Sequence, residues 1–158
     1  NKGVDLADLV RNLNTQVMER ARGERFITVF IGRCCLRTGR MEYVNAGHSP
    51  PLLLRADGSI EELSSGSIAL GMLPELPFIK QGEADLRHAT LLCYTDGLVE
   101  QEDRHGNDFG MTPVRKALSQ FASAGPEAIN QALIGNFEAH RGGLPYLDDI
   151  ALLTCRFT

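Results

Sequence analysis

The chain has no excess of positive charge, no CxxC pair and no long hydrophobic run, and each absence argues against a class of protein. Its formal net charge of −4 argues against nucleic acid as the main partner, because phosphate binding needs a basic surface. No apolar run in the 158 residues approaches the ~18 residues of a membrane-spanning helix, so no membrane partner is expected. The four cysteines, which fall in predicted strands, show no CxxC spacing, and this favours buried reduced thiols in a cytoplasmic protein over disulfides or a zinc site: Cys34, Cys35, Cys93 and Cys155.

Several common catalytic signatures are also missing. The sequence contains no phosphate-binding P-loop, no Rossmann glycine fingerprint, no HExxH zinc helix and no nucleophile elbow, and no Ser–His–Asp triad can be argued for. It has no internal repeat, low-complexity tract or interdomain linker. With 43% hydrophobic and 23% charged residues, the composition is that of an ordinary globular domain. The first residue, Asn1, is not an initiator methionine, and we interpret this start as the middle of a longer protein.

Periodicity predicts a helix first, then strands, then two helices and a last strand. An apolar stripe at three- and four-residue steps predicts the first helix, with Asp5 as N-cap, Arg20 and Arg22 in its last turn and Gly23 as its end: Leu6, Leu9, Val10, Leu13 and Val17. Runs rich in β-branched or apolar residues predict strands at 26–35, 41–44, 52–54, 60–63, 78–86, 89–95 and 148–157. Helical spacing returns from Met111 and again from Pro126 to Arg141. Segregated runs of this kind indicate an α+β fold.

The first candidate site is acidic. The apolar strand 89–95 runs directly into Asp96 and Gly97, and a second apolar run opens with Asp148 and Asp149. If the two strands are neighbours, their carboxylates converge, and oxygen ligands alone select a hard cation such as Mg²⁺ or Mn²⁺ over zinc. Turn and capping roles for the same residues remain the alternative.

Two other segments have both a chemical and a structural interpretation. His48, in the segment 45–51, has a side chain that titrates near neutrality and could act as a general acid, but its glycine and proline neighbours favour a turn. The polar loop 100–110 follows Asp96 and could act in recognition or gating, or could simply be a solvated loop.

Taken together, the motifs make the chain resemble the metal-dependent serine/threonine protein phosphatase family (PPM, or protein phosphatase 2C-like), in its bacterial SpoIIE/RsbU-like branch. The matching stretches occur in family order and cover nearly the whole chain after the first helix: 25–30, 38–51, 69–72, 92–100, 106–110 and 148–153.

The resemblance implies an α–β–β–α sandwich of two antiparallel sheets flanked by helices, with two Mn²⁺ or Mg²⁺ ions at one edge. It implies that Asp96 and Asp148 are metal ligands, that Asp149 occupies the adjacent motif position, and that Gly97 belongs to the same cofactor-binding site. Family members hydrolyse phosphoserine or phosphothreonine with a metal-activated water, and in this branch the substrate is usually a small anti-anti-sigma (STAS-type) protein. An attached sensory or response-regulator domain sets the activity.

The chain departs from the family pattern in two places. A Gly-Asp-Val-Ser-Gly-His-Gly-like segment is absent, and Ala151 replaces the usual threonine. We therefore expect residues 1–158 to be the C-terminal portion of a single phosphatase domain, incomplete at its N-terminus and weak or inactive alone. The alternative is a non-catalytic interaction module with a degenerate phosphatase fold. A truncated sandwich would expose sheet edges and helix faces, so a homodimer through Leu6, Leu9 and Leu13 is also possible.

Overall fold

A computed structural model describes residues 5–21 and 24–158 of the chain. The chain divides into two compact units, one formed by Asn1–Pro50 with Leu63–Arg87 and the other by Pro51–Glu62 with His88–Thr158. Among the described residues, no helix is both long and apolar enough to cross a membrane.

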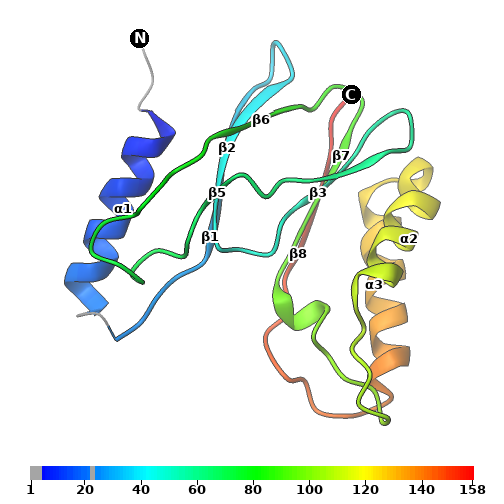
Figure 1. Cartoon of the computed structure of the whole chain (residues 1–158). Helices are drawn as coiled ribbons and strands as arrows, with labels where there is room; N and C mark the ends of the chain where they lie inside the picture. The colour runs from blue at the N-terminus through cyan, green and yellow to red at the C-terminus, as the bar shows by residue number, and fades with distance from the viewer. Residues whose placement is uncertain (1–4, 22–23) are drawn as a thin grey trace. The chain divides into compact units, whose positions relative to one another are not determined.

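The first unit contains one helix and a four-stranded sheet (Figure 1). Its elements are α1 (Leu6–Ala21), β1 (Val29–Cys35), β2 (Arg40–Ala46), β5 (Gly66–Ser67) and β6 (Gly82–Asp85). The strands predicted at 26–35 and 41–44 form a hairpin, in which β1 pairs with β2 in antiparallel register from Val29 opposite Ala46 to Cys35 opposite Arg40. β6 is also antiparallel to β2, but the two-residue strand β5 runs parallel to it.

The predicted apolar stripe forms the inner face of α1. Leu6 and Val10 are buried in a cluster with β2 residues, and the remaining stripe residues pack against the same cluster: Leu9, Leu13 and Val17. The predicted N-cap is confirmed, since the Asp5 Oδ1 atom accepts a hydrogen bond of 2.7 Å from the Ala7 backbone N–H. The predicted helix end at Arg22 and Gly23 lies outside the described residues. Leu6 therefore belongs to the core of this unit, and the structure does not test the homodimer.

The second unit consists of a four-stranded antiparallel sheet and a pair of helices that lie side by side (Figure 1). The sheet has the order β4-β3-β7-β8, formed by β3 (Leu52–Leu54), β4 (Ile60–Glu62), β7 (Thr90–Tyr94) and β8 (Leu152–Arg156). The other elements are η1 (Asp96–Leu98), α2 (Met111–Phe121), η2 (Ala122–Ala124) and α3 (Pro126–Arg141). Sheet and helix residues share one core, whose buried members are Leu52, Leu54, Leu92, Tyr94, Leu98, Phe109, Val114, Ala117, Leu118, Ile129, Leu133 and Phe137.

The ends of α3 follow from its sequence. Pro126 occupies the first turn, where its missing N–H costs no hydrogen bond, and Gly142 ends the helix with a left-handed φ of 59°. The Gly142 N–H donates to the Glu138 carbonyl at 3.1 Å, which closes the last turn. The chain beyond α3 therefore leaves at a fixed point and returns to the sheet as β8.

Several sequence-based details are wrong. The first strand begins at Val29 and not at Phe26. Of the segment 78–86, which was predicted as a strand, only the residues of β6 form one. The sheets are not purely antiparallel, because of β5. The last strand begins at Leu152, so Asp148 and Asp149 lie in the preceding loop. All four cysteines lie in strands as predicted, but the prediction that they are buried is wrong: Cys93 and Cys155 are half-buried, and Cys34 and Cys35 are exposed because both faces of the last part of β1 are uncovered.

At the coarse level, the predicted class is confirmed. The described residues form an α+β fold with two sheets and three α-helices. The sheet of the second unit presents both acid-bearing segments of the candidate site.

Candidate metal centre

Asp96 lies at the point where the buried strand β7 leaves the sheet. Leu91 and Leu92 are buried, as expected for a strand covered on both faces, and the chain then turns into η1 with Asp96 as its first residue. The Asp96 side chain is exposed, and its Oδ1 atom accepts a hydrogen bond of 3.1 Å from the Gly97 N–H. The end of an inner strand thus presents this carboxylate to solvent.

The second acidic segment lies beside it because β8 is the neighbour of β7. Tyr94 pairs with Leu152 in antiparallel register, so the residues after β7 lie opposite those before β8. The Thr95 hydroxyl continues this pairing with side-chain bonds: it donates to the Asp149 carbonyl at 3.0 Å and accepts from the Ala151 N–H at 2.9 Å. The condition set for the acidic site, that the two apolar strands be neighbours, is therefore met.

Gly97 is the point of closest approach between the two segments. A Cβ atom at this position would lie 2.6 Å from the Asp149 carbonyl oxygen and 3.2 Å from the Asp148 Cβ atom. Only a residue without a side chain fits there, because any Cβ would meet backbone within the van der Waals distance. The glycine at position 97 therefore allows the segment that carries Asp96 to lie directly beside the segment that carries Asp148.

The donor chemistry of the site fits a hard divalent cation. Asp96, Asp148 and Asp149 are all exposed, and their carboxylates offer only oxygen, which suits Mg²⁺ or Mn²⁺. Within residues 5–21 and 24–158, no three His, Cys, Asp or Glu side chains converge in a way that would hold an ion. Metal ligation by these three residues and a cofactor role for Gly97 stay predictions.

A cavity of about 400 Å³ borders the acidic pair within the second unit. Its walls are mostly apolar and its rim carries carboxylates: Leu98, Ile134, Phe137, Glu138, Tyr146, Asp148, Asp149, Ile150 and Leu152.

His48 takes the structural role that its glycine and proline neighbours favoured. Its backbone N–H donates to the Asn45 Oδ1 atom at 2.8 Å, and the Asn45 amide donates back to the His48 carbonyl at 2.9 Å. The imidazole Nδ1 atom lies 3.3 Å from the Thr28 hydroxyl. These contacts close a turn after β2, and they supply no observation in favour of a general acid.

The loop 100–110 is ordered by its own hydrogen bonds. The Asp103 carboxylate accepts from the Asn107 backbone N–H at 2.9 Å, from the Asn107 side-chain amide, and from the His105 N–H at 2.8 Å. The Asn107 backbone bond, followed by its side-chain bond, lowers the pKa of Asp103 from 3.8 to about 2.

This loop gives a prediction for acid pH. Because the folded-state pKa of Asp103 is depressed, its contribution to stability is present above the ordinary value of 3.8 and is lost as the pH falls towards about 2. We expect carbon-detected NMR to give a titration midpoint near 2 for Asp103, and Asn107→Ala to raise it only part of the way because the backbone donor remains. A midpoint near 3.8 in the unmodified chain would contradict the loop geometry.

Sequence reasoning missed two residues that organise the site, Thr95 and Gln101. Thr95 falls inside the predicted strand 89–95, and no local pattern indicates that its hydroxyl bonds to the backbone of Asp149 and Ala151. Gln101 stands among charged residues of a polar loop, and nothing in the sequence indicates that it is buried.

Comparison with solved structures identifies the fold as that of a PP2C-type phosphatase domain. The Mn-presoaked phosphatase domain of SpoIIE from Bacillus subtilis superposes with a TM-score of 0.69 at 16% identity, over 99% of this chain and 67% of that one. At this identity the likeness speaks for the fold only.

Sequence comparison then gives the family. The profile described as "Stage II sporulation protein E (SpoIIE)" matches residues 1–158, and the chain belongs to this family of PP2C-type serine phosphatases. Protein IcfG of Synechocystis sp. is 31% identical over 131 residues, 81% of this chain and 20% of that protein. Phosphoserine phosphatase RsbP of Bacillus subtilis is 27% identical over 95 residues, 60% of this chain and 24% of that protein. The chain thus spans a quarter or less of the length of these two relatives.

Proposed function

We propose that this chain forms part of an Mn²⁺- or Mg²⁺-dependent phosphatase domain that hydrolyses phosphoserine or phosphothreonine on a bacterial signalling protein. The observation that carries the proposal is the meeting of the Asp96 and Asp148 segments at Gly97. The family membership and the Mn-presoaked SpoIIE phosphatase domain support it. By analogy with the SpoIIE/RsbU-like branch, the substrate is an anti-anti-sigma protein of the STAS type.

In this proposal, each residue of the site has a separate task. Asp96 and Asp148 offer carboxylate oxygens to the cation, Asp149 stands next to them, and Gly97 allows the two segments to approach. Thr95 fixes the end of β7 to the loop before β8 through its hydroxyl. When bound, the cation supplies positive charge that acidifies a water molecule and neutralises the transferring phosphoryl group.

We further propose that residues 1–158 are the C-terminal portion of a single phosphatase domain, in which the two sheets face each other between layers of helices. This is supported by the coverage of the SpoIIE phosphatase structure, of which the chain spans 67%. Two ions are expected in the complete domain. A sensory or response-regulator domain, a cytoplasmic location and a possible homodimer belong to the same proposal, and the greater length of IcfG and RsbP leaves room for such domains.

One observation favours a second candidate, a non-catalytic interaction module. In the part of the chain that the structure describes, the candidate site brings together too few ligands for a three-residue metal cluster. A pure binding module needs no divalent ion at these carboxylates, so calorimetric titration with Mn²⁺ separates the two candidates. A heat of Mn²⁺ binding that is measured for the unmodified chain and is lost in the Asp96→Asn variant supports the phosphatase.

Phosphate release from a phosphoserine peptide tests the proposed function directly. We expect a chain extended to the full length of a phosphatase domain to turn over in Mn²⁺ and to stop in EDTA. The 158-residue chain alone should be slow or inactive, because its described residues hold so few ligands. Turnover that persists in EDTA would rule out the proposed chemistry, and robust turnover by the short chain would refute the expectation of a weak fragment.

A further inference from the structure

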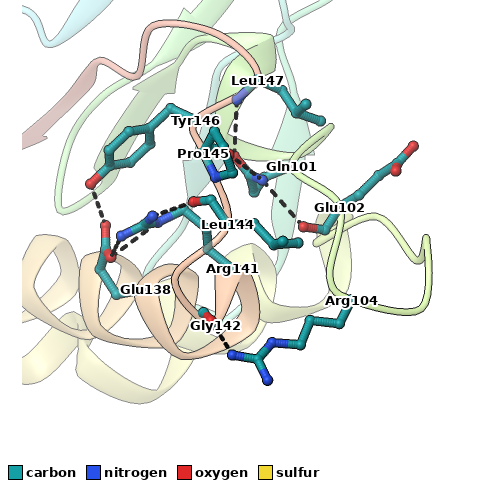
Figure 2. A network of polar contacts seen from close by, with 10 residues as sticks. All are labelled: Gln101, Glu102, Arg104, Glu138, Arg141, Gly142, Leu144, Pro145, Tyr146 and Leu147. Carbon is teal, nitrogen blue, oxygen red and sulfur yellow. Dashed lines mark hydrogen bonds and ion pairs between the residues drawn. The ribbon is translucent and has the colours of Figure 1, made fainter.

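The segment that leads from α3 to the acidic pair is held by one buried side chain. Gln101 is only 1% exposed, although it stands in a polar loop. Its amide nitrogen donates to the Pro145 carbonyl at 3.2 Å and to the Glu102 carbonyl at 3.2 Å, and its amide oxygen accepts from the Leu147 N–H at 3.2 Å (Figure 2). Both amide hydrogens and the oxygen of Gln101 are therefore engaged, two of the three bonds with residues directly before Asp148.

A buried amide in this position is informative because burial without partners is costly. Leaving one buried donor or acceptor unpaired costs about 1–3 kcal/mol, so an apolar residue would be the simpler filling for a site with only a packing role. Gln101 instead makes bonds that fix one particular path for residues 145–147. A buried, fully paired polar side chain specifies geometry more sharply than apolar contacts do.

The last turn of α3 holds the same segment from its other side. Arg141 donates to the Leu144 carbonyl, and its guanidinium lies 4.3 Å from the centre of the Tyr146 ring. The Tyr146 hydroxyl donates to Glu138 at 2.7 Å, and Glu138 also pairs with Arg141 (Figure 2). The residues from Leu144 to Leu147 thus each make a contact with α3 or with Gln101, and the chain enters Asp148 from a fixed direction.

The acidic pair is fixed on its far side as well. Thr95 bonds to the Asp149 carbonyl and the Ala151 N–H, so the loop is anchored both after and before the two aspartates. Both anchors, Thr95 and Gln101, belong to the segment that contains Asp96. One short stretch of chain therefore carries one acidic group and holds the other on two sides.

We propose that Gln101 is a positioning residue of the metal centre, whose amide sets the spacing between Asp96 and Asp148 by tying residues 145–147 to the segment that follows Asp96. The proposal rests on the proposed function for its metal, and on the hydrogen bonds of Gln101 for its geometry. Gln101 touches neither acidic side chain and acts through the backbone that carries Asp148.

The test uses Gln101→Met, which keeps the length of the side chain and removes its hydrogen bonds. Loss of a group that orients a ligand typically weakens metal binding about 10–100-fold, so we expect the Mn²⁺ affinity, measured by electron paramagnetic resonance of free Mn²⁺, to fall at least about tenfold. The matched control is Gln131→Met, the same change at an exposed position of α3, which should leave the affinity unchanged.

Repeating the substitution in a chain that already carries Asp148→Asn distinguishes a positioning role of Gln101 from a general loss of local structure. In an Asp148→Asn chain the ligand that Gln101 positions is already impaired, so Gln101→Met should weaken Mn²⁺ binding there by less than about twofold. In the unmodified background, amide exchange followed by NMR should accelerate at Leu147 and stay unchanged along β7. A purely structural role would instead accelerate exchange in β7 and weaken Mn²⁺ binding equally in both backgrounds.

Two results overturn the proposal: wild-type Mn²⁺ affinity in Gln101→Met, or an equal loss in the presence and absence of Asp148. If the unmodified chain binds no Mn²⁺, the proposed function is what fails. Hydrogen exchange at the Leu147 amide then tests the role of Gln101 by itself. An unchanged exchange rate in Gln101→Met would show that Gln101 does not hold residues 145–147.

Discussion

Replacing Asp96 by asparagine is expected to remove Mn²⁺ binding and, in the complete phosphatase domain, Mn²⁺-dependent phosphate release. Asparagine has the same shape but lacks the charge that a hard cation requires. Changes in residues that merely orient ligands cost about 10–100-fold in metal affinity, so loss of a ligand itself should cost at least about 100-fold. Asp96 is exposed and its one side-chain bond is to the adjacent backbone, so thermal unfolding should stay close to that of the unmodified chain.

The matched control is Asp108→Asn, the same substitution at another exposed aspartate of the second unit. It should leave both Mn²⁺ affinity and phosphate release unchanged. Retained Mn²⁺-dependent activity in Asp96→Asn would remove Asp96 from the role proposed for it. An equal loss in both variants would show that net charge, and not a specific ligand, attracts the cation.

Gly97→Ala is expected to damage the site without replacing any candidate carboxylate ligand. The added Cβ would lie 2.6 Å from the Asp149 carbonyl oxygen, and this neighbour is backbone that cannot rotate away. Crowding of this kind costs about 1–3 kcal/mol of stability. The loop that carries the two aspartates must also shift, so we expect Mn²⁺ affinity to fall about tenfold or more, as for other changes that misplace a ligand.

Gly135→Ala provides the matched control. Gly135 lies within α3, and a Cβ there meets no atom within 4 Å. Alanine in a helix interior is about 1 kcal/mol more favourable than glycine, so this variant should be slightly stabilised and should bind Mn²⁺ normally. Unfolding by urea and titration with Mn²⁺ measure both effects. Normal metal binding in Gly97→Ala would mean that the approach of the two segments is irrelevant to the site.

The parts of the fold that were predictable are those in which local pattern and burial agree. The apolar run of β7 and the amphipathic stripes of α1, α2 and α3 appear where periodicity placed them. The adjacency of Asp96 and Asp148 could also be anticipated, because each follows or precedes an apolar run that needs a partner strand. In each case the same residues determine both the local structure and the burial.

The parts that were missed depend on contacts between distant residues. β5 can lie beside β2 because position 66 is a glycine: a Cβ there would lie 1.7 Å from the Asn45 carbonyl oxygen, an approach that no local pattern reveals. Gln101 is buried because Pro145 and Leu147 offer it partners 44 and 46 residues away. Periodicity describes a segment alone, whereas these positions are fixed by where another segment passes.

The most direct measurement is the anomalous diffraction of Mn²⁺ in a crystal of this chain. The account predicts a peak within bonding distance of carboxylate oxygens from both Asp96 and Asp148, on the side of Gly97 where the two segments meet. A peak elsewhere on the chain, with the carboxylates of Asp96 and Asp148 turned away from each other, would contradict it.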